Sequence, residues 1–345
     1  MSLERDLQQI IDESLFEIGC PGIIARIETD TFSWNGISGT LDFADIDRGF
    51  YICSLSKTYT AIAILKFVEQ GKLNLGNRLS DFFDEITPFQ DVTIRQLLNH
   101  SSHIPDYVLF DDYLSQVNQS PQAPWSREVI SKRARKAGFI DASDIASHYS
   151  NTGYMYLYQI LEKISGKKFS EVIKDLIIDP LELRSTYVAT EIDRERVLIP
   201  AHDPNFIEFD GDIRGQYHPD WCATGILVSN VREVCSLYRN LLEGAILTSS
   251  SMAEMLHGIE TPFWMGSSKA LSNGKLSNGL GIKICDEFPL GPFWGHGGDC
   301  PGYSVWAGYL DVSGGQSITS CILLNTIVGC PPAGLWIKLA ERIVS

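Results

Sequence analysis

The spacing of apolar residues along the first third of the chain predicts three elements in succession. Residues 3–18 carry apolar side chains near helical spacing, and Gly19-Cys20-Pro21-Gly22 ends this stretch, so it predicts an amphipathic helix. Residues 23–27 and 31–34 are two β-like runs separated by a polar turn, which is typical of a hairpin. From Ser54 to Gly71 the pattern is helical and largely apolar, which predicts a central helix.

The rest of the chain divides into a helical part and a strand-rich part. Residues 73–200 predict short amphipathic helices joined by polar loops, including 93–100 and 170–178. After Gly225, β-branched residues and glycines become frequent. This part predicts strands at 279–282, 303–310 and 317–324, before a closing helix at 333–343.

These elements together predict an α+β fold, with an antiparallel sheet flanked by helices and an all-helical region inserted into it. The N-terminal hairpin and the C-terminal strands supply the sheet. We expect a discontinuous sheet domain formed by residues 1–72 and 205–345, and a mainly helical domain formed by residues 73–204. The chain shows no internal repeat and no low-complexity segment.

Composition and charge exclude several classes of partner. The formal charge is -15, from 43 acidic and 28 basic side chains. No Lys/Arg-rich run is present, so nucleic acid and anionic membrane surfaces are not expected partners. No run of about 18 apolar residues predicts a membrane span. The polar N-terminus lacks the pattern of a secretory signal, so a cytoplasmic location is expected for the chain as given, or a periplasmic or secreted one if a leader has been removed.

The eight cysteines are scattered, with no pair at two-residue spacing, which argues against a zinc ribbon or a thioredoxin-like site. Most of them are expected to be small buried apolar side chains, and Cys53 is interpreted as a core thiol.

The segment Ser54-Leu55-Ser56-Lys57 opens the central helix and is the first candidate for catalysis. Ser54 and Lys57 lie three residues apart and therefore share one helix face. A neutral lysine can accept the serine proton, and burial favours the neutral amine. Ser165-Gly166-Lys167-Lys168 and Ser272-Asn273-Gly274-Lys275 also fit this short pattern. They lie in polar, glycine-broken stretches that predict turns.

Tyr149-Ser150-Asn151 is the second candidate, on an expected loop before a helix at residues 154–164. A phenol can relay a proton, and an amide can bind a substrate carbonyl. The alternative is a loop aromatic that covers the core. Tyr238-Arg239-Asn240 has the same pattern, but it falls within an amphipathic helix and is interpreted as surface.

His296-Gly297-Gly298 is the third candidate, in the glycine-rich stretch 295–302 that leads into a strand. Small residues let a substrate approach a strand edge closely. His296 could supply a hydrogen bond or a partial positive charge, and a backbone N–H beyond it could form an oxyanion hole with that of Ser54. The alternative is a glycine turn with an incidental histidine. The motif order excludes an α/β-hydrolase, whose oxyanion loop precedes a Gly-x-Ser-x-Gly elbow that this chain lacks.

The three motifs, in this order and at long intervals, resemble those of the class C β-lactamase and penicillin-binding protein family, with its carboxypeptidase, D-aminopeptidase and carboxylesterase relatives. Residues 97–105 and 221–229 resemble two further segments of that family. The resemblance implies a cleft between a sheet domain and a helical region, and no metal or organic cofactor. It also implies roles for five residues: Ser54 as nucleophile, Lys57 as general base, Tyr149 as proton relay, Asn151 as substrate-amide ligand and His296 as the polar group of the third motif.

The third motif departs from the Lys-Thr-Gly of class C β-lactamases, because histidine and glycine replace the lysine and the threonine. Gly297, Gly298 and Asp299 are expected to contact the substrate, and Asp299 to oppose a substrate carboxylate. His103 stands where the family has glycine. We therefore expect hydrolysis of a small ester or amide. D-alanyl-D-alanine carboxypeptidase or β-lactamase activity is the alternative, and a non-catalytic penicillin sensor or scaffold is an alternative of another class.

Overall fold

The computed structural model describes residues 2–141, 145–195, 197–205, 211–261, 276–312, 315–327 and 331–345. The segment Ser272-Asn273-Gly274-Lys275 and Cys330 lie outside the described residues. No helix in the described part of the chain is both long enough and apolar enough to cross a membrane.

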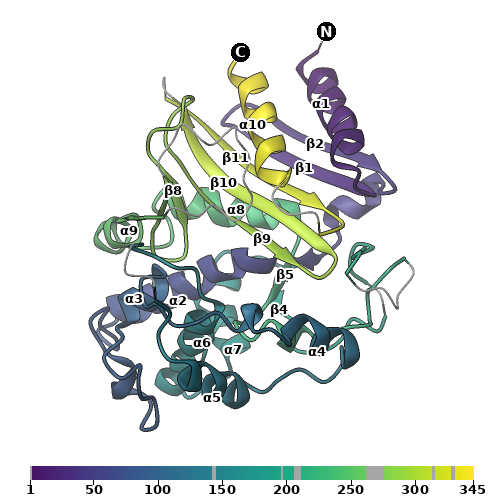
Figure 1. The fold of residues 1–345 in the computed structure, drawn as a ribbon. Coiled ribbons are helices and arrows are strands. Elements are labelled where there is room, and N and C mark those ends of the chain that lie inside the picture. The colour runs from purple at the N-terminus through teal and green to yellow at the C-terminus, as the bar shows by residue number, and fades with distance from the viewer. Residues whose placement is uncertain are drawn as a thin grey trace.

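The main feature is an antiparallel sheet of eight strands in the order β2-β1-β11-β10-β9-β8-β7-β6 (Figure 1). The N-terminal hairpin joins the C-terminal strands through β1 and β11, where Ile24 pairs with Leu323. The predicted α+β class with an antiparallel sheet is therefore confirmed. The strand bounds are β1 Gly22–Glu28, β2 Ser33–Gly39, β6 Ile259–Glu260, β7 Leu276–Asn278, β8 Lys283–Cys285, β9 Phe293–Cys300, β10 Tyr303–Val312 and β11 Gln316–Leu324.

Helices cover both faces of this sheet. Helices α1 (Leu3–Ile18) and α10 (Pro331–Val344) pack together on one face, and α8 (Val231–Leu242) packs on the other (Figure 1). Because side chains alternate between the two faces of each strand, the sheet contributes apolar residues to two separate cores, one on each face. On β10, for example, Trp306 packs in the core beneath α1 and α10, whereas Val305 packs in the core on the α8 side.

A helical region lies beyond α2 (Ser56–Glu69), on the side away from the large sheet (Figure 1). Nearly every residue of α2 is buried, as the apolar pattern predicts. The remaining helices are α3 Ile94–Leu98, α4 Tyr113–Gln119, α5 Arg127–Ala137, α6 Asn151–Ser165, α7 Phe169–Ile173 and α9 Ser249–Met255. The division into residues 1–72 with 205–345 and residues 73–204 stays a prediction.

A second, three-stranded sheet connects the two parts. It has the order β3-β5-β4, formed by Phe50–Tyr51, Leu227–Ser229 and Tyr187–Val188. The short strand β3 leads directly to Ser54. This small sheet therefore fixes the direction from which the chain enters the first motif.

Two local predictions and one alternative were wrong. Residues 279–282 form the turn between β7 and β8 and not a strand, because Gly281 has a φ of +71° and an added Cβ would lie 2.5 Å from Ala61 on α2. The alternative of a glycine turn at His296-Gly297-Gly298 is excluded, because these residues lie inside β9. Tyr238 is not on the surface: it is buried on α8, and its hydroxyl lies 3.2 Å from Thr58 Oγ1.

Candidate active site

Ser54 lies in a 3-10 turn, Cys53–Leu55, between β3 and α2. Backbone contacts hold both sides of this turn against β5: Ile52 N donates to Leu227 O at 2.9 Å, and Leu227 N donates to Ser56 Oγ at 3.0 Å. Cys53 has a φ of +51°, a conformation that few residues other than glycine adopt. The surrounding contacts therefore fix a sharp turn that leaves the Ser54 hydroxyl at the cleft.

Lys57 is one helical turn further along and is 2% exposed. Its Nζ donates to Ser54 Oγ at 3.0 Å and to Asn151 Oδ1 at 2.7 Å. Burial lowers the pKa of Lys57 to about 8, although the negative charge of Asp106 opposes this shift. The structure thus brings the serine and the lysine of the first motif into direct contact, with an amine that is partly neutral near pH 8.

The Tyr149 phenol also interacts with the Ser54 hydroxyl, which opposes the rise of its pKa. Its ring stacks on His100 at a centroid distance of 4.2 Å, and the backbone N–H of Ser150 donates to His100 Nδ1 at 3.2 Å. Burial raises the pKa of Tyr149 above its usual range, so the side chain stays a phenol at neutral pH. Segment 97–105 therefore supports the second motif through the contacts of His100 with Tyr149 and Ser150.

Asn151 is the first residue of α6, and its side-chain amide is already engaged on both sides. Oδ1 accepts from Lys57, and Nδ2 donates to Asp106 Oδ2 at 2.9 Å. A substrate amide bound by Asn151, as expected, therefore has to share these atoms with Lys57 and Asp106. Asp106 was missed in the sequence because no local pattern marks it. It follows Pro105, and only the fold brings it to Asn151.

His296 lies on β9 and is 2% exposed. Its Nδ1 is 2.5 Å from Gly297 O, and because a carbonyl can only accept, Nδ1 carries the proton and donates. Burial, together with the charges of Lys283 and Lys57, lowers the pKa of His296 well below its usual range. His296 is therefore neutral with Nε2 as an acceptor, which supports the hydrogen-bonding interpretation and not the positive charge.

Gly298 is the point where β9 touches the 3-10 turn Cys53–Leu55, which carries Ser54. A Cβ at this position would lie 2.5 Å from the Ser54 backbone nitrogen, so only glycine allows this approach. Strand β8 pairs with β9 only at Phe293–Gly295. Beyond Gly295, the described residues place no strand against this edge of β9, which borders the cleft.

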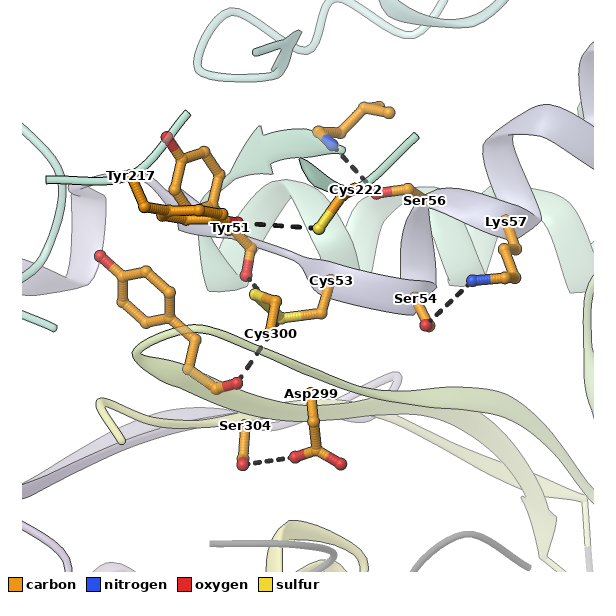
Figure 2. The surroundings of a disulfide bond; sticks show 12 residues. Tyr51, Cys53, Ser54, Ser56, Lys57, Tyr217, Cys222, Asp299, Cys300 and Ser304 are labelled. Carbon is orange, nitrogen blue, oxygen red and sulfur yellow. Dashed lines mark hydrogen bonds between the residues drawn. A yellow bond between two sulfur atoms is a disulfide. The ribbon is translucent and has the colours of Figure 1, made fainter. Parts of the chain in front are cut away.

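The expected substrate contacts of Gly297 and Asp299 stay predictions, but the strand turns both side-chain positions away from Ser54. Successive residues of a strand point to opposite faces, and His296 and Gly298 lie on the face toward Ser54. A Cβ on Gly297 would meet Trp306 at 3.0 Å, and the Asp299 carboxylate accepts from Ser304 Oγ at 2.5 Å on the far side of β9 from Ser54 (Figure 2). Both residues border the cleft, but the Asp299 carboxylate does not face it. Its expected opposition to a substrate carboxylate stays a prediction, because its charge still acts on Tyr149 in the cleft.

Lys283, at the start of β8, is a second residue that the sequence analysis missed. It pairs with Gly295 across the sheet, and its Nζ lies 5.2 Å from the centre of the Tyr149 ring. Nζ also donates to Asn278 Oδ1. The cleft therefore holds a lysine besides Lys57, supplied by the strand beside the third motif. The sequence contained no signal for this, because Lys283 meets the motif only through strand pairing.

Cys53 and Cys300 form a disulfide (Figure 2), so the prediction that Cys53 is a free core thiol was wrong. The bond joins two residues 247 positions apart, the residue before Ser54 and the last residue of β9. It links the Cys53–Leu55 turn covalently to the strand that carries the third motif. The expectation of buried thiols is confirmed for four others, namely Cys20, Cys235, Cys285 and Cys321, whereas Cys222 is half-buried and borders the cleft.

Reduction of this disulfide is expected to destabilise the protein by about 2–4 kcal/mol, because the unfolded chain regains the freedom of a very long loop. Thermal unfolding with and without a strong reductant measures the effect. The double variant Cys53→Ala/Cys300→Ala is the control, since the reductant should leave its melting temperature unchanged. An equal reductant-induced shift in both proteins would show that another thiol is responsible.

The motif-like segment at Ser165 is structural. Ser165 is the last residue of α6, its Oγ donates to Leu161 O at 2.7 Å, and Lys167 forms an exposed ion pair with Asp175. His103 has a φ of +53°, a backbone conformation that favours glycine.

These groups, among them Ser54, Lys57, Tyr149 and His296, line one cleft of about 450 Å³. Part of its lining is apolar and comes from the 3-10 helix Tyr107–Leu109 and from α4, through Val108, Leu109, Leu114 and Val117. Among the residues that the structure describes, no group of three or more His, Cys, Asp or Glu side chains is placed to hold a metal ion.

A family model described as Beta-lactamase matches residues 44–319, most of the chain. The chain belongs to the Beta-lactamase family. Among curated proteins, it is 35% identical over 144 residues to penicillin-binding protein 4* of Bacillus subtilis (strain 168), and 24% identical over 190 residues to a teichoic acid D-alanine hydrolase of Staphylococcus aureus. These matches cover 40% and 53% of this chain, but only 30% and 43% of the two relatives.

Solved structures of the same fold cover nearly the whole chain. A D-stereospecific amidohydrolase from Streptomyces sp. aligns with a TM-score of 0.83 at 24% identity, covering 96% of this chain and 97% of that protein. A D-amino acid amidase from Ochrobactrum anthropi SV3 aligns with a TM-score of 0.81 at 22% identity, covering 99% of both chains. At these identities, the structural similarity establishes the fold.

Proposed function

We propose that this protein is a serine hydrolase that cleaves a small ester or amide through an acyl-enzyme on Ser54. The observation that carries the proposal is the 3.0 Å contact between Ser54 Oγ and Lys57 Nζ, with the pKa of Lys57 lowered to about 8. A neutral amine at this distance can take the serine proton during attack.

The reaction follows from this geometry in two halves. Ser54 Oγ attacks the substrate carbonyl carbon while Lys57 accepts the hydroxyl proton, and the tetrahedral oxyanion lies against the Ser54 N–H and an amide of the β9 edge. Tyr149 passes a proton to the leaving group as its bond to carbon breaks, and the proton that Lys57 took from Ser54 returns to Tyr149. Water then attacks the ester carbon, gives its proton back through the same groups and releases the acid and Ser54.

Three features favour a small amide or ester with an apolar substituent. The wall formed by Val108, Leu109 and Leu114 is apolar, and burial of such a substituent there favours binding. His296 Nε2 is an unprotonated acceptor that suits an N–H donor on the substrate. The names of relatives that hydrolyse D-amino acid amides or teichoic acid D-alanine agree with a substrate of this chemistry.

A carboxylate-bearing substrate, such as a peptide ending in D-alanine or a β-lactam, is the second candidate, and Lys283 favours it. This ammonium group lies beside Tyr149 and can pair with a carboxylate. The two candidates make different demands on Lys283, since loss of its charge should weaken only the carboxylate substrates.

Intact mass after a fluorophosphonate or penicillin, followed by turnover of p-nitrophenyl esters, D-amino acid amides and nitrocefin, tests the proposal. Labelling of Ser54 with turnover of a neutral ester or amide supports it, and preferred turnover of nitrocefin or D-alanyl-D-alanine peptides favours the second candidate. A stable penicillin adduct without turnover would indicate a sensor. A folded protein that no serine-directed reagent labels would indicate a scaffold.

The disulfide next to the nucleophile also bears on location. Disulfides form and persist in oxidising compartments. The pairing of Cys53 with Cys300 therefore favours the periplasmic or secreted alternative over the cytoplasm.

The rate of Ser54 acylation is expected to rise about tenfold per pH unit below pH 8 and to level off above it. The reason is that only the neutral Lys57 amine is a base, and the pKa of Lys57 is lowered to about 8. The second-order rate of fluorophosphonate labelling between pH 5.5 and 10.5 measures this profile without knowledge of the substrate. A rate that keeps rising beyond pH 10 would indicate an unshifted lysine.

A further inference from the structure

Asp106 is a buried carboxylate that none of the three motifs includes. It is 5% exposed and lies immediately before the 3-10 helix Tyr107–Leu109, where Oδ1 accepts from Val108 N at 3.3 Å. Its other oxygen, Oδ2, accepts from Asn151 Nδ2 at 2.9 Å. The carboxylate therefore lies two hydrogen bonds away from the Lys57 amine.

The position of Asp106 is fixed by Thr152 on the first turn of α6. Thr152 Oγ1 donates to Pro105 O at 2.6 Å and accepts from Tyr107 N at 3.0 Å. The residues on both sides of Asp106 are thus attached to the same helical turn that carries Asn151. The contact between the carboxylate and the amide is a consequence of the backbone and not of a mobile side chain.

This contact decides which way the Asn151 amide points. A carboxylate only accepts hydrogen bonds, so the NH₂ group of Asn151 must face Asp106, and Oδ1 must then face Lys57. The reversed amide would place two donors against each other at Lys57. Asp106 therefore ensures that Lys57 meets an acceptor at 2.7 Å while its Nζ stays 3.0 Å from Ser54 Oγ.

Asp106 also contributes charge in a buried part of the site. Burial raises the pKa of Asp106 to about 6, and the charge of Lys57 opposes that shift. Among the described residues, the other titratable groups that sense the charge of Asp106 or of Lys57 have pKa values shifted toward their neutral forms: Tyr107, Tyr113, Tyr149, Cys222, His100 and His296. Lys283 is a further charged group at this site, with its Nζ 5.2 Å from the centre of the Tyr149 ring. It is a cation, so it cannot replace the negative charge with which Asp106 raises the pKa of Lys57.

We propose that Asp106 is a positioning residue for the base. It acts through Asn151 to direct the Lys57 amine at Ser54, and its negative charge sets the pH range in which that amine is neutral. The inference rests on the proposed function of Ser54 and Lys57. It predicts a defect that depends on pH, which a purely structural aspartate does not cause.

The test is the pH profile of fluorophosphonate labelling for Asp106→Asn. This change removes the charge and keeps a side chain of the same size whose carbonyl can still accept from Asn151. Without the negative charge the protonated lysine is less stable, so the pKa of Lys57 falls and the acid limb moves to lower pH by about one unit or more. The labelling rate at pH 6 should accordingly rise relative to the plateau.

Asp111→Asn is the matched control, because Asp111 is exposed in the turn just beyond this segment, and its profile should equal that of the wild type. Asp106→Glu keeps the charge but displaces it by one methylene. It should leave the acid limb in place and lower the plateau about tenfold or more, as loss of a supporting contact does in other sites. If Asp106→Asn does not fold, the plateau rate of Asp106→Glu still tests the positioning role of Asp106.

An acid limb at the wild-type pH in folded Asp106→Asn, or an unaltered plateau in Asp106→Glu, overturns the inference and leaves the proposed function intact. Failure of the wild-type protein to label at Ser54 is a different result. It overturns the proposed function and, with it, the role of Asp106.

Discussion

Ser54→Ala is expected to abolish labelling by fluorophosphonates and to lower kcat by about 10³-fold or more, because covalent catalysis loses its attacking atom. The variant should fold normally, since it removes only a hydroxyl that interacts with Lys57 and Tyr149 within the cleft. Intact mass after labelling and steady-state kinetics on the best ester of the substrate panel measure both effects.

Ser165→Ala is the control for this experiment. Ser165 belongs to the same short pattern, but its Oγ caps the end of α6 through Leu161 O. Its loss should leave labelling and kcat unchanged. Full labelling of folded Ser54→Ala would contradict the assignment of the nucleophile.

Lys57→Arg is expected to inactivate the protein although it keeps a positive charge, because a guanidinium stays protonated throughout the working pH range. Less than about a tenth of kcat/KM should remain, a loss of more than about 1.4 kcal/mol in transition-state stabilisation. The larger arginine must also fit a site that is 2% exposed. The melting temperature of each variant should therefore be measured beside its kinetics.

Lys283→Arg makes the same substitution in the same cleft and provides the comparison. If Lys283 acts only through its charge, arginine replaces it, and neutral esters should be cleaved at nearly the wild-type rate. Retention of more than about a tenth of kcat/KM by folded Lys57→Arg would exclude Lys57 as the base.

The sequence determined those parts of the site that depend on local spacing. Ser54 and Lys57 share a helix face because residues three apart always do so on a helix, and the apolar run to Gly71 shows that this helix is buried. The hairpin of β1 and β2, the strands β10 and β11, and α10 likewise follow from apolar periodicity within single segments. The order of the three motifs indicated the resemblance to the family.

Only the tertiary structure decided which groups meet across the chain. Asp106 reaches Lys57 through Asn151, Lys283 reaches Tyr149 through the pairing of β8 with β9, and Cys53 bonds to Cys300 across 247 positions. No local pattern encodes such contacts, because they depend on packing between distant segments.

The side of the strand on which a residue lies was decided in the same way. Asp299 was expected at the substrate because it directly follows the third motif in the sequence. Once residues 293–300 form β9, the two-residue alternation of a strand places His296 and Gly298 toward Ser54 and turns the Asp299 carboxylate to Ser304 on the opposite face. The reactive groups of the site could be recognised in the sequence from their residue types. The face of the strand on which each side chain lies, and the burial that shifts its pKa, could only be known from the fold.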